Sequence, residues 1–294
     1  MILLFGIYEG RTMIDNNRIF HIEDLEDERV ALYASYNEPQ LLHYNEPDRG
    51  IFIAETPKVI DRAITFGAKT LSFFAETDAL RNEAVQSVII KTDESVPVFE
   101  AELSVINKIT GFNLTRGLLA VFERPYLPDA NSILGDCRRV VVLEDIVNPT
   151  NVGAIFRSAA ALGMEAVFLT SGCSDPFYRR AARVSMGTVF MVPWTYLPKE
   201  SGTVDFLHKN GFTAIAMETG EDSVPLNDPV LRTYEKTAVI FGAEGAGISK
   251  ETLNRSDRIV NIPMQNDVDS LNVAAASAVT FWELCRGFSP KRRD

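Results

Sequence analysis

Three loops in the second half of the chain combine polar side chains with glycines and other small residues, and could therefore hold a ligand. They occupy residues 148–159, 240–249 and 262–273, and each leads from an apolar run, typical of a strand, into a helical pattern. In open α/β sheets, ligands bind in the crevice outside the carboxyl ends of the strands. The three loops can therefore belong to one binding site.

The first loop carries an asparagine and an arginine at the start of a predicted helix. Asn151 is expected to open this helix, over residues 151–163, and Gly153 would let a ligand approach it closely. Arg157 follows Asn151 by six residues, about 1.7 helical turns. It would supply a fixed positive charge, because an arginine is normally always protonated. A surface salt bridge is the alternative for Arg157.

The second loop places three glycines, Gly242, Gly245 and Gly247, on either side of Glu244. Glycine there would free backbone amides and carbonyls to meet a ligand. The spacing differs from the G-x-G-x-x-G pattern of dinucleotide sites, and no clear βαβ unit with a ribose-binding acid follows. The loop therefore indicates a ligand site of another kind, with a plain turn as the alternative.

The third loop leads into a long helix expected from Ser270 to about Arg286. Ser270 also suits a plain helix N-cap, and both roles are compatible. Two acids, Asp267 and Asp269, precede it. They could change the choice of substrate at the mouth of the site.

Around these loops, apolar runs alternate with helical patterns from residue 139 onward. Continuous apolar runs are typical of strands buried on both faces of a parallel sheet, so the pattern predicts a parallel α/β sheet. The expected strands are 140–143, 166–169, 188–192, 213–217, 238–241 and 258–262, and the expected helices are 151–163, 175–185, 202–210 and 270–286.

A shorter alternation precedes it and predicts a second, smaller α/β domain over residues 50–125. Residues 1–49 are acidic and irregular, and 126–136 carry proline and polar residues typical of a linker. The remaining 137–294 form the main domain. In the smaller domain the expected strands are 51–54, 70–74, 87–90 and 117–122, and the expected helices are 57–67, 78–84 and 97–109.

The bulk composition fits two domains of an ordinary globular protein. The chain has 294 residues, of which 46% are hydrophobic and 23% charged. No run approaches the ~18 apolar residues of a membrane span, and the apolar start lacks the features of a signal peptide. Scattered cysteines favour a reducing, cytoplasmic setting, and isolated histidines give no support for a metal site or a catalytic triad. These residues are Cys137, Cys173, Cys285, His21, His43 and His208.

The net charge of −11 argues against a generally basic, nucleic-acid-binding surface. The first 135 residues hold 21 Asp and Glu against 12 Lys and Arg, so the acidity lies mainly there. Any basic patch must be local, and each candidate could also be ordinary solvated surface. The candidates are Arg138 with Arg139, Arg157, Arg179 with Arg180 and Arg183, and Lys291 with Arg292 and Arg293.

Taken in order, the three loops resemble the three signature motifs of the SpoU/TrmH branch of the SPOUT methyltransferases. The matching segments are Asn148–Ala159, Ile240–Ser249 and Ile262–Val273. Members of this branch use S-adenosylmethionine to methylate ribose 2′-hydroxyls in RNA. The resemblance implies an RNA 2′-O-methyltransferase of the EC 2.1.1 class.

The same resemblance modifies the expected fold. The pattern alone predicts an unknotted sheet, because knots are rare, whereas SPOUT domains bury their C-terminal segment in a deep trefoil knot. The chain after Phe241 would then thread through an earlier loop. The smaller domain, in segments 52–60 and 115–121, resembles the ribosomal-protein-L30e-like domain that precedes the catalytic domain in many members.

The resemblance also implies roles for individual residues. Arg157 would position the target phosphate and help withdraw the hydroxyl proton electrostatically, and Glu144, at the end of the preceding strand, either orients Arg157 or is an ordinary loop carboxylate. Family dimers pack through the knotted domain, where Phe281, Trp282 and Leu284 offer an apolar face that could equally be core. The implied catalytic residues are Asn151, Arg157, Glu244 and Asn272; the implied cofactor-binding residues are Met217, Gly242, Gly247, Ile262, Met264, Ser270 and Leu271; the expected RNA contacts are Arg138, Arg139 and Arg157.

Three alternatives stay open from the sequence. The chain could be an RNA-binding or ribosome-assembly module that has lost catalysis, although the retained polar residues argue against this. It could act on transfer RNA, although the L30e-like domain favours ribosomal RNA. It could also act on a small molecule, which the acidic net charge fits better than RNA binding.

Overall fold

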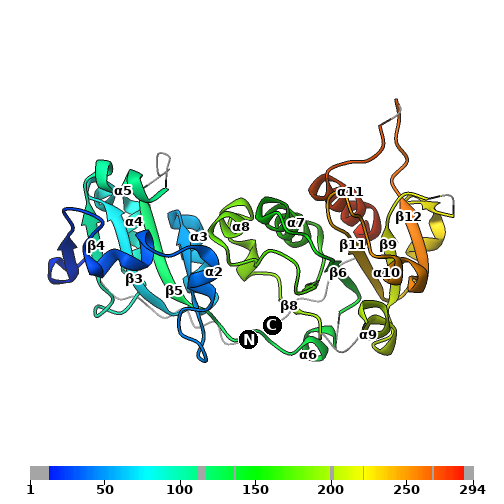
Figure 1. Cartoon of the computed structure of the whole chain (residues 1–294), viewed down its shortest axis with the longest axis horizontal. Helices are drawn as coiled ribbons and strands as arrows, with labels where there is room; N and C mark the ends of the chain where they lie inside the picture. Colours follow the sequence, from blue (N-terminus) through cyan, green and yellow to red (C-terminus); the bar gives the residue numbers. More distant parts are fainter. Residues whose placement is uncertain are drawn as a thin grey trace. The chain divides into compact units, whose positions relative to one another are not determined.

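The computed structural model describes residues 13–110, 117–135, 137–198, 202–220, 222–266 and 268–287. It divides into two compact units (Figure 1). The first runs to Tyr126 and includes Phe177–Gly187, and the second contains Leu127–Pro176 and the chain from Thr188 onward. Several residues singled out above lie outside the described ranges, namely Asp267, Lys291, Arg292, Arg293 and residues 115–116.

The second unit is built on a seven-stranded sheet within the described residues, with the strand order β10-β12-β9-β11-β6-β7-β8. Every neighbouring pair is parallel, as the apolar runs predict. β6 and β11 are buried at every position, which explains their continuous apolar sequences. The strands are β6 (Arg139–Leu143), β7 (Ala166–Leu169), β8 (Trp194–Tyr196), β9 (Thr213–Met217), β10 (Val224–Pro225), β11 (Thr237–Phe241) and β12 (Arg258–Asn261).

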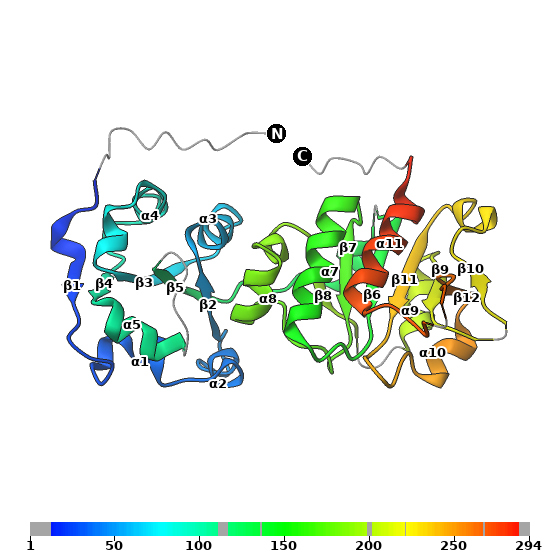
Figure 2. The same cartoon turned by 90° about the horizontal axis from the view of Figure 1, so that it is seen from above.

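Helices cover both faces of this sheet (Figures 1 and 2). α7 (Pro149–Leu162) and α11 (Val273–Cys285) lie side by side on one face. On the other face, α6 (Ala130–Leu134) and α9 (Thr203–Lys209) share an apolar core with β6, β7, β9 and β11. α10 (Lys250–Arg255) contacts α9. The unit is therefore a three-layer α/β sandwich.

The last part of the second unit crosses the sheet. β12 lies next to β9, whereas α11, which follows β12 in the sequence, packs against α7, the helix that connects β6 with β7. Residues 262–266 and 268–272 pass the carboxyl ends of β9 and β11 on this path and project from the unit (Figure 1). This is the segment after Phe241 that the resemblance places in the knot.

The first unit is a five-stranded mixed sheet in its described part, with the strand order β1-β4-β3-β5-β2. β5 runs antiparallel to both β2 and β3. One apolar core lies between this sheet and the helices α1, α2 and α5. The elements are β1 (Ile19–His21), β2 (Ile51–Glu55), β3 (Thr70–Glu76), β4 (Val98–Ala101), β5 (Leu118–Glu123), α1 (Ala31–Ala34), α2 (Glu38–Leu42), α3 (Pro57–Thr65), α4 (Glu83–Ile89), α5 (Leu103–Thr110) and α8 (Arg179–Val184).

Three expected elements were wrong. Residues 87–89 belong to α4, with Ile90 as its C-cap, rather than to a strand, because Val85, Val88 and Ile89 bury one helical face after the N-cap Asn82. The expected helix over 97–109 begins as β4, which pairs with β1 and β3, and only then becomes α5. The expected strand over 188–192 is a short 3-10 turn, and the strand follows at β8.

Short 3-10 helices complete the described secondary structure. One of them, over Asp78–Arg81, occupies most of the segment 78–84 expected to be α-helical. The full set is Asn16–Arg18, Glu28–Val30, Asp78–Arg81, Thr188–Phe190 and Pro229–Arg232.

The segments expected to flank the smaller domain carry regular structure. Within residues 1–49, β1 extends the sheet of the first unit by pairing with β4. Within residues 126–136, α6 buries Ile133 and Leu134 in the core of the second unit. Residue types common in linkers therefore do not exclude a short helix capped by Asp129, whose carboxylate accepts two backbone amides.

We expect Leu134→Ala to lower the free energy of unfolding by about 2–5 kcal/mol, because it empties a fully buried position. Urea unfolding of the full chain measures this loss. Asn131→Ala, at an exposed position of the same helix, is the control and should stay within about 0.5 kcal/mol of the parent protein. A Leu134→Ala effect as small as the control would mean that α6 contributes little to the core.

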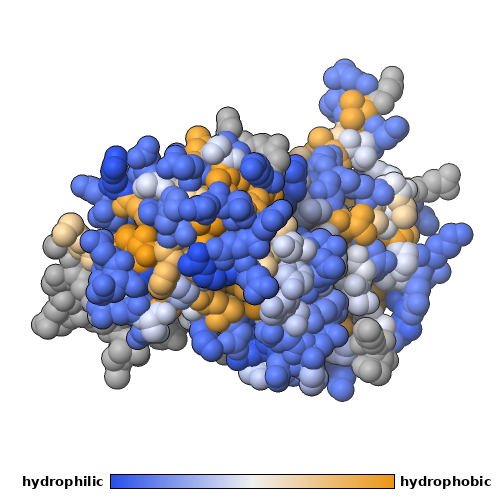
Figure 3. All heavy atoms as spheres, turned by 60° about the vertical axis from the view of Figure 1, so that its left-hand side comes forward, coloured by the Kyte–Doolittle hydropathy of each residue, from blue (hydrophilic) through white to orange (hydrophobic). Residues whose placement is uncertain are grey.

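Apolar side chains are exposed at separate places on both units. Most of the face drawn in Figure 3 is hydrophilic, with apolar areas between the polar ones. In the second unit, Val147 and Trp282 expose 69% and 61% of their surface, and Val279 exposes 43%. Val279 and Trp282 lie three residues apart on α11, and therefore on one face of that helix.

Candidate active site

A cavity of about 510 Å³ lies at the carboxyl ends of β9, β11 and β12. It brings the second and third loops together, as the strand order requires. All seven residues that the resemblance assigns to the cofactor line this cavity, namely Met217, Gly242, Gly247, Ile262, Met264, Ser270 and Leu271. Glu244 and Asn272 line it as well.

Gly242 is required by the fold of the second loop itself. Ala243 and Gly247 exchange two backbone hydrogen bonds, at 3.1 and 2.9 Å, which fold the loop back on itself. A Cβ atom on Gly242 would lie 2.2 Å from the carbonyl carbon of Gly247. The close approach at Gly242 is therefore between two parts of the backbone, so this glycine serves the fold of the loop in addition to the expected role of freeing backbone groups for a ligand.

Glu144 anchors the end of the same loop. Its carboxylate is buried and accepts hydrogen bonds from the amide of Ser249 at 2.7 Å and from Oγ1 of Thr252 at 2.6 Å. These two donors lie at the start of α10. Of the two roles left open for Glu144, the described contacts fit a structural carboxylate rather than one that orients Arg157.

Three polar residues from the three loops form one hydrogen-bonded cluster. Nδ2 of Asn151 donates to Oε1 of Glu244 at 2.5 Å, and Nδ2 of Asn272 donates to the same oxygen at 2.8 Å. Nδ2 of Asn272 also lies 3.4 Å from Oδ1 of Asn151. Two amide donors thus converge on one carboxylate oxygen at the edge of the cavity.

The local structure holds each member of this cluster in place. Asn151 lies in the first turn of α7 and is 5% exposed. Oδ1 of Asn272 accepts from the amide of Ala274 at 3.0 Å and so caps α11, the role we had considered for Ser270. Glu244 lies within the folded glycine loop, between Ala243 and Gly247. A polar group near this cluster would therefore meet preorganised donors and acceptors.

Arg157 is not part of this cluster. It is exposed on α7, and its side chain makes no hydrogen bond or ion pair with any residue in the described ranges. Asn151, by contrast, is buried. The structure therefore brings Asn151, Glu244 and Asn272 together and leaves Arg157 available to a molecule that approaches from outside.

The expectation that Arg139 contacts RNA is wrong. Arg139 is only 7% exposed, and its guanidinium donates to the backbone carbonyls of Glu235, Tyr234 and Arg138. Desolvation on burial lowers the pKa of this guanidinium. Arg138 directly precedes β6, and Arg139 is its first residue. Both therefore lie at the amino end of the sheet, opposite the cavity.

The other expected basic patch lies in the first unit. Arg179, Arg180 and Arg183 line a cavity of about 440 Å³ together with Glu38 and Glu55. Glu55 is buried and accepts from Nη1 of Arg183 at 3.2 Å. These cations are therefore interleaved with carboxylates rather than forming an uninterrupted positive surface.

One residue of the cavity was missed by sequence reasoning. Glu218 directly follows β9, and its carboxylate accepts from the amide of Thr219 at 3.0 Å and from that of Ile248 at 3.3 Å. It also lies against the second loop, because a Cβ on Gly247 would be 2.5 Å from its Oε2. A polar residue at the end of a parallel strand is the signal that could have found it.

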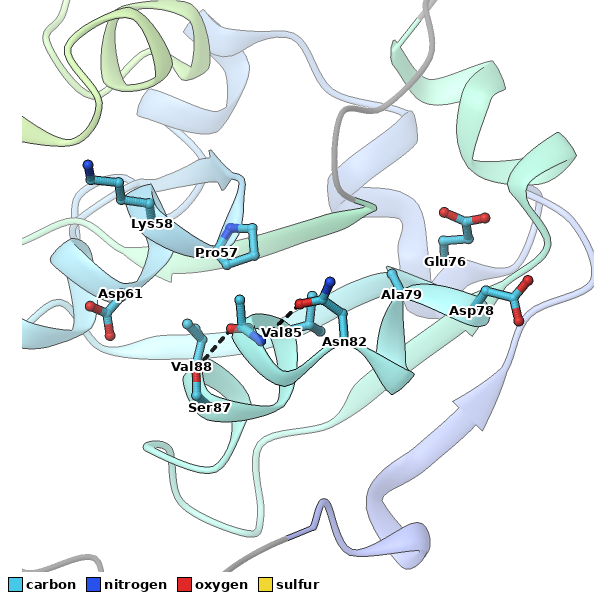
Figure 4. A pocket seen from close by; sticks show the side chains of 11 residues that line it. Pro57, Lys58, Asp61, Glu76, Asp78, Ala79, Asn82, Val85, Ser87 and Val88 are labelled. Atoms are coloured by element: carbon cyan, nitrogen blue, oxygen red, sulfur yellow. Dashed lines mark hydrogen bonds between the residues drawn. The ribbon is translucent and has the colours of Figure 1, made fainter.

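A second large cavity, of about 600 Å³, lies in the first unit, and Figure 4 shows the side chains that line it. Two of its acids are engaged, since Asp61 pairs with Lys91 and Asp78 pairs with Arg81. Asn82 caps α4 by accepting a backbone amide at 2.9 Å. These polar groups stabilise the local fold, and the described lining includes no residue of the three loops.

The described residues contain neither a cluster of metal-binding side chains nor a helix that could cross a membrane. Within them, no group of three or more His, Cys, Asp or Glu side chains could hold a metal ion. No helix in the same part of the chain is both long and apolar enough to span a bilayer. The three cysteines are buried, and none of them forms a disulfide.

Comparisons with known proteins match the chain to RNA-modifying enzymes. The sequence model of the SpoU rRNA Methylase family matches residues 138–282. An uncharacterized tRNA/rRNA methyltransferase of Mycobacterium tuberculosis is 35% identical over 239 residues, which cover 81% of this chain and 82% of that protein. The 23S rRNA (guanosine-2′-O-)-methyltransferase RlmB of Coxiella burnetii is 27% identical over 233 residues, which cover 78% of this chain and 81% of RlmB.

Solved structures share the fold of most of the chain. An AdoMet-bound rRNA methyltransferase from Sinorhizobium meliloti aligns with a TM-score of 0.75 at 24% identity. The alignment covers 92% of this chain and 99% of that one. A putative TrmH-family RNA methyltransferase from Porphyromonas gingivalis aligns with a TM-score of 0.65 at 25% identity, covering 81% of this chain and 90% of that one. The fold of most of the chain is thus found in other proteins.

Proposed function

The chain belongs to the SpoU rRNA methylase family of RNA methyltransferases, and from this premise we propose that it transfers a methyl group from S-adenosylmethionine to a ribose 2′-hydroxyl of RNA. The observation that carries the proposal is the convergence of the second and third loops on one cavity, with Asn151 of the first loop bonded to Glu244 at its edge. Ribosomal RNA is the favoured substrate, because the RlmB relative acts on 23S rRNA.

The cavity fits S-adenosylmethionine in size and chemistry. Its volume of about 510 Å³ lies within the range of small-molecule sites. Met217, Ile262, Met264 and Leu271 provide apolar surface for an adenine ring. The carboxylates of the lining suit the ammonium and sulfonium groups. When bound there, the cofactor would supply the electrophilic methyl group.

The residues of the chain would position the acceptor hydroxyl. Asn151, Glu244 and Asn272 form a preorganised polar cluster at the edge of the cavity, which suits binding of a ribose hydroxyl. Arg157 would bind the neighbouring phosphate and stabilise the negative charge that develops as the hydroxyl loses its proton. A role as the base itself is unsuited to arginine, which is normally always protonated.

The test is to identify the methylated atom. The full chain is incubated with methyl-labelled S-adenosylmethionine and with ribosomal or transfer RNA from a strain that lacks the protein. We expect label in a 2′-O-methylated nucleoside of the ribosomal RNA, detected by mass spectrometry after digestion. Label on a base would contradict the proposed atom, and label in transfer RNA alone would replace ribosomal RNA as the substrate. Cofactor binding without labelling of either RNA would favour the inactive module.

We further propose that the first unit recognises the RNA and that the protein acts as a homodimer through the second unit. The likeness of residues 50–125 to L30e supports the first role.

For the dimer, Phe281 and Leu284 belong to the core, with exposures of 0% and 5%, so Trp282 and Val279 are the apolar residues of α11 available to a partner.

Trp282→Ala should weaken self-association by at least about tenfold, because buried tryptophans dominate interface energies. Sedimentation equilibrium measures the dimer dissociation constant. Tyr126→Ala removes an aromatic side chain that is 80% exposed in the first unit and should leave association unchanged. Equal behaviour of the two variants would place the interface elsewhere.

A further inference from the structure

The candidate cofactor cavity carries carboxylates without a balancing cation. Glu218, Glu244 and Asp269 line it, and none of its described lining residues is a lysine or an arginine. Each carboxylate of the lining attracts a positively charged ligand, whereas a neutral ligand gains little affinity from these charges. The lining therefore distinguishes ligands by their charge.

The proposed reaction changes the charge of the molecule in this cavity. S-adenosylmethionine carries a sulfonium cation, and its product S-adenosylhomocysteine carries a neutral thioether at the same atom. The ammonium and carboxylate of the amino-acid part are common to both. Any difference in affinity that comes from charge must therefore arise at the sulfur.

We propose that Glu218 is a specificity-determining residue that makes the cavity prefer the sulfonium cofactor over the thioether product and so promotes product release. The proposal rests on the proposed function. Glu244 is less suited to this role, because it belongs to the hydrogen-bonded cluster with Asn151 and Asn272. Asp269 is also less suited, because it is exposed and its charge is screened by water.

The residues around Glu218 hold its carboxylate in one position and shield it partly from water. Its two oxygens accept from the amides of Thr219 and Ile248, which hold the side chain against the glycine loop. Gly247 leaves room for it, since a Cβ there would lie 2.5 Å from Oε2. If a cation lies roughly 6 Å from such a carboxylate and the effective dielectric constant is about 40, the attraction makes a cationic ligand bind about tenfold more tightly than a neutral one.

Binding of three ligands to the full chain without RNA tests the proposal. The ligands are S-adenosylmethionine, S-adenosylhomocysteine and sinefungin, which has a protonated amine in place of the sulfonium, and calorimetry measures each dissociation constant. We expect the parent protein to bind the two cationic ligands about tenfold more tightly than S-adenosylhomocysteine. Glu218→Gln should reduce this ratio to about twofold and largely retain the affinity for S-adenosylhomocysteine.

Two further variants separate charge from structure. Glu218→Asp keeps the charge and should keep the ratio, even if all three ligands bind more weakly. Asp269→Asn removes an exposed charge from the same cavity and should change the ratio by less than about threefold. Equal weakening of all three ligands in Glu218→Gln, or an unchanged ratio, would overturn the proposal and leave the proposed function standing. Failure of the parent protein to bind any of the three would overturn both.

Discussion

Replacing Arg157 with alanine should reduce methyl transfer to RNA by at least about 100-fold and leave the affinity for S-adenosylhomocysteine unchanged. The reason is the position of this side chain. Arg157 is exposed on α7, its side chain makes no hydrogen bond or ion pair with the residues described, and it lies outside the described lining of the cavity. Its loss should therefore weaken the interaction with the RNA. The fold and the binding of the cofactor should stay unchanged.

Single-turnover methylation and calorimetry on the same preparation check both halves of this expectation. Arg157→Lys should also be slow, because an ammonium cannot reproduce the planar, bidentate guanidinium. Lys209→Ala, which removes an exposed cation from α9 of the same unit, is the control and should retain full activity. Loss of cofactor binding in Arg157→Ala would show that Arg157 acts within the cavity instead.

The second large effect is expected at Gly242, where an alanine should abolish binding of S-adenosylhomocysteine. The added Cβ would lie 2.2 Å from the carbonyl carbon and 2.3 Å from the carbonyl oxygen of Gly247. Backbone atoms at that distance cannot be avoided by a change of rotamer, so the loop must open. The cavity then loses the wall that Ala243, Glu244 and Gly247 provide.

Gly245→Ala is the matched control, because it lies in the same loop at a φ of 86° and its Cβ would meet no atom within 4 Å. It should cost about 1–2 kcal/mol of backbone strain and still bind the ligand. Calorimetry gives the affinities, and circular dichroism shows whether each variant is folded. Normal binding by Gly242→Ala would remove the second loop from the site.

Much of the fold follows from local signals in the sequence. The strands β6, β7, β9 and β11 lie where continuous apolar runs predict them, because a strand buried on both faces needs mostly apolar residues. β12 also lies within the expected segment 258–262, although only Val260 is buried there. Local signals predicted the wrong secondary structure where contacts with distant parts of the chain decide the conformation. Residues 98–101 are a strand because β1 and β3 flank them, and α6 is part of a core because an apolar layer of the second unit covers it.

The candidate site likewise combines features that the sequence predicts with features that only the tertiary structure fixes. The sequence by itself determined which residue types stand at the ends of which strands, because strand ends, glycines and helix starts are recognisable within a few residues. Only the tertiary structure decided the partners of each side chain. It bonded Asn151 to Glu244, 93 positions away, turned Arg139 inward to the carbonyls of Tyr234 and Glu235, and placed Glu218 against Gly247. Hydrogen bonds between distant residues depend on how the strands are ordered in the sheet, and no local pattern of residues encodes that order.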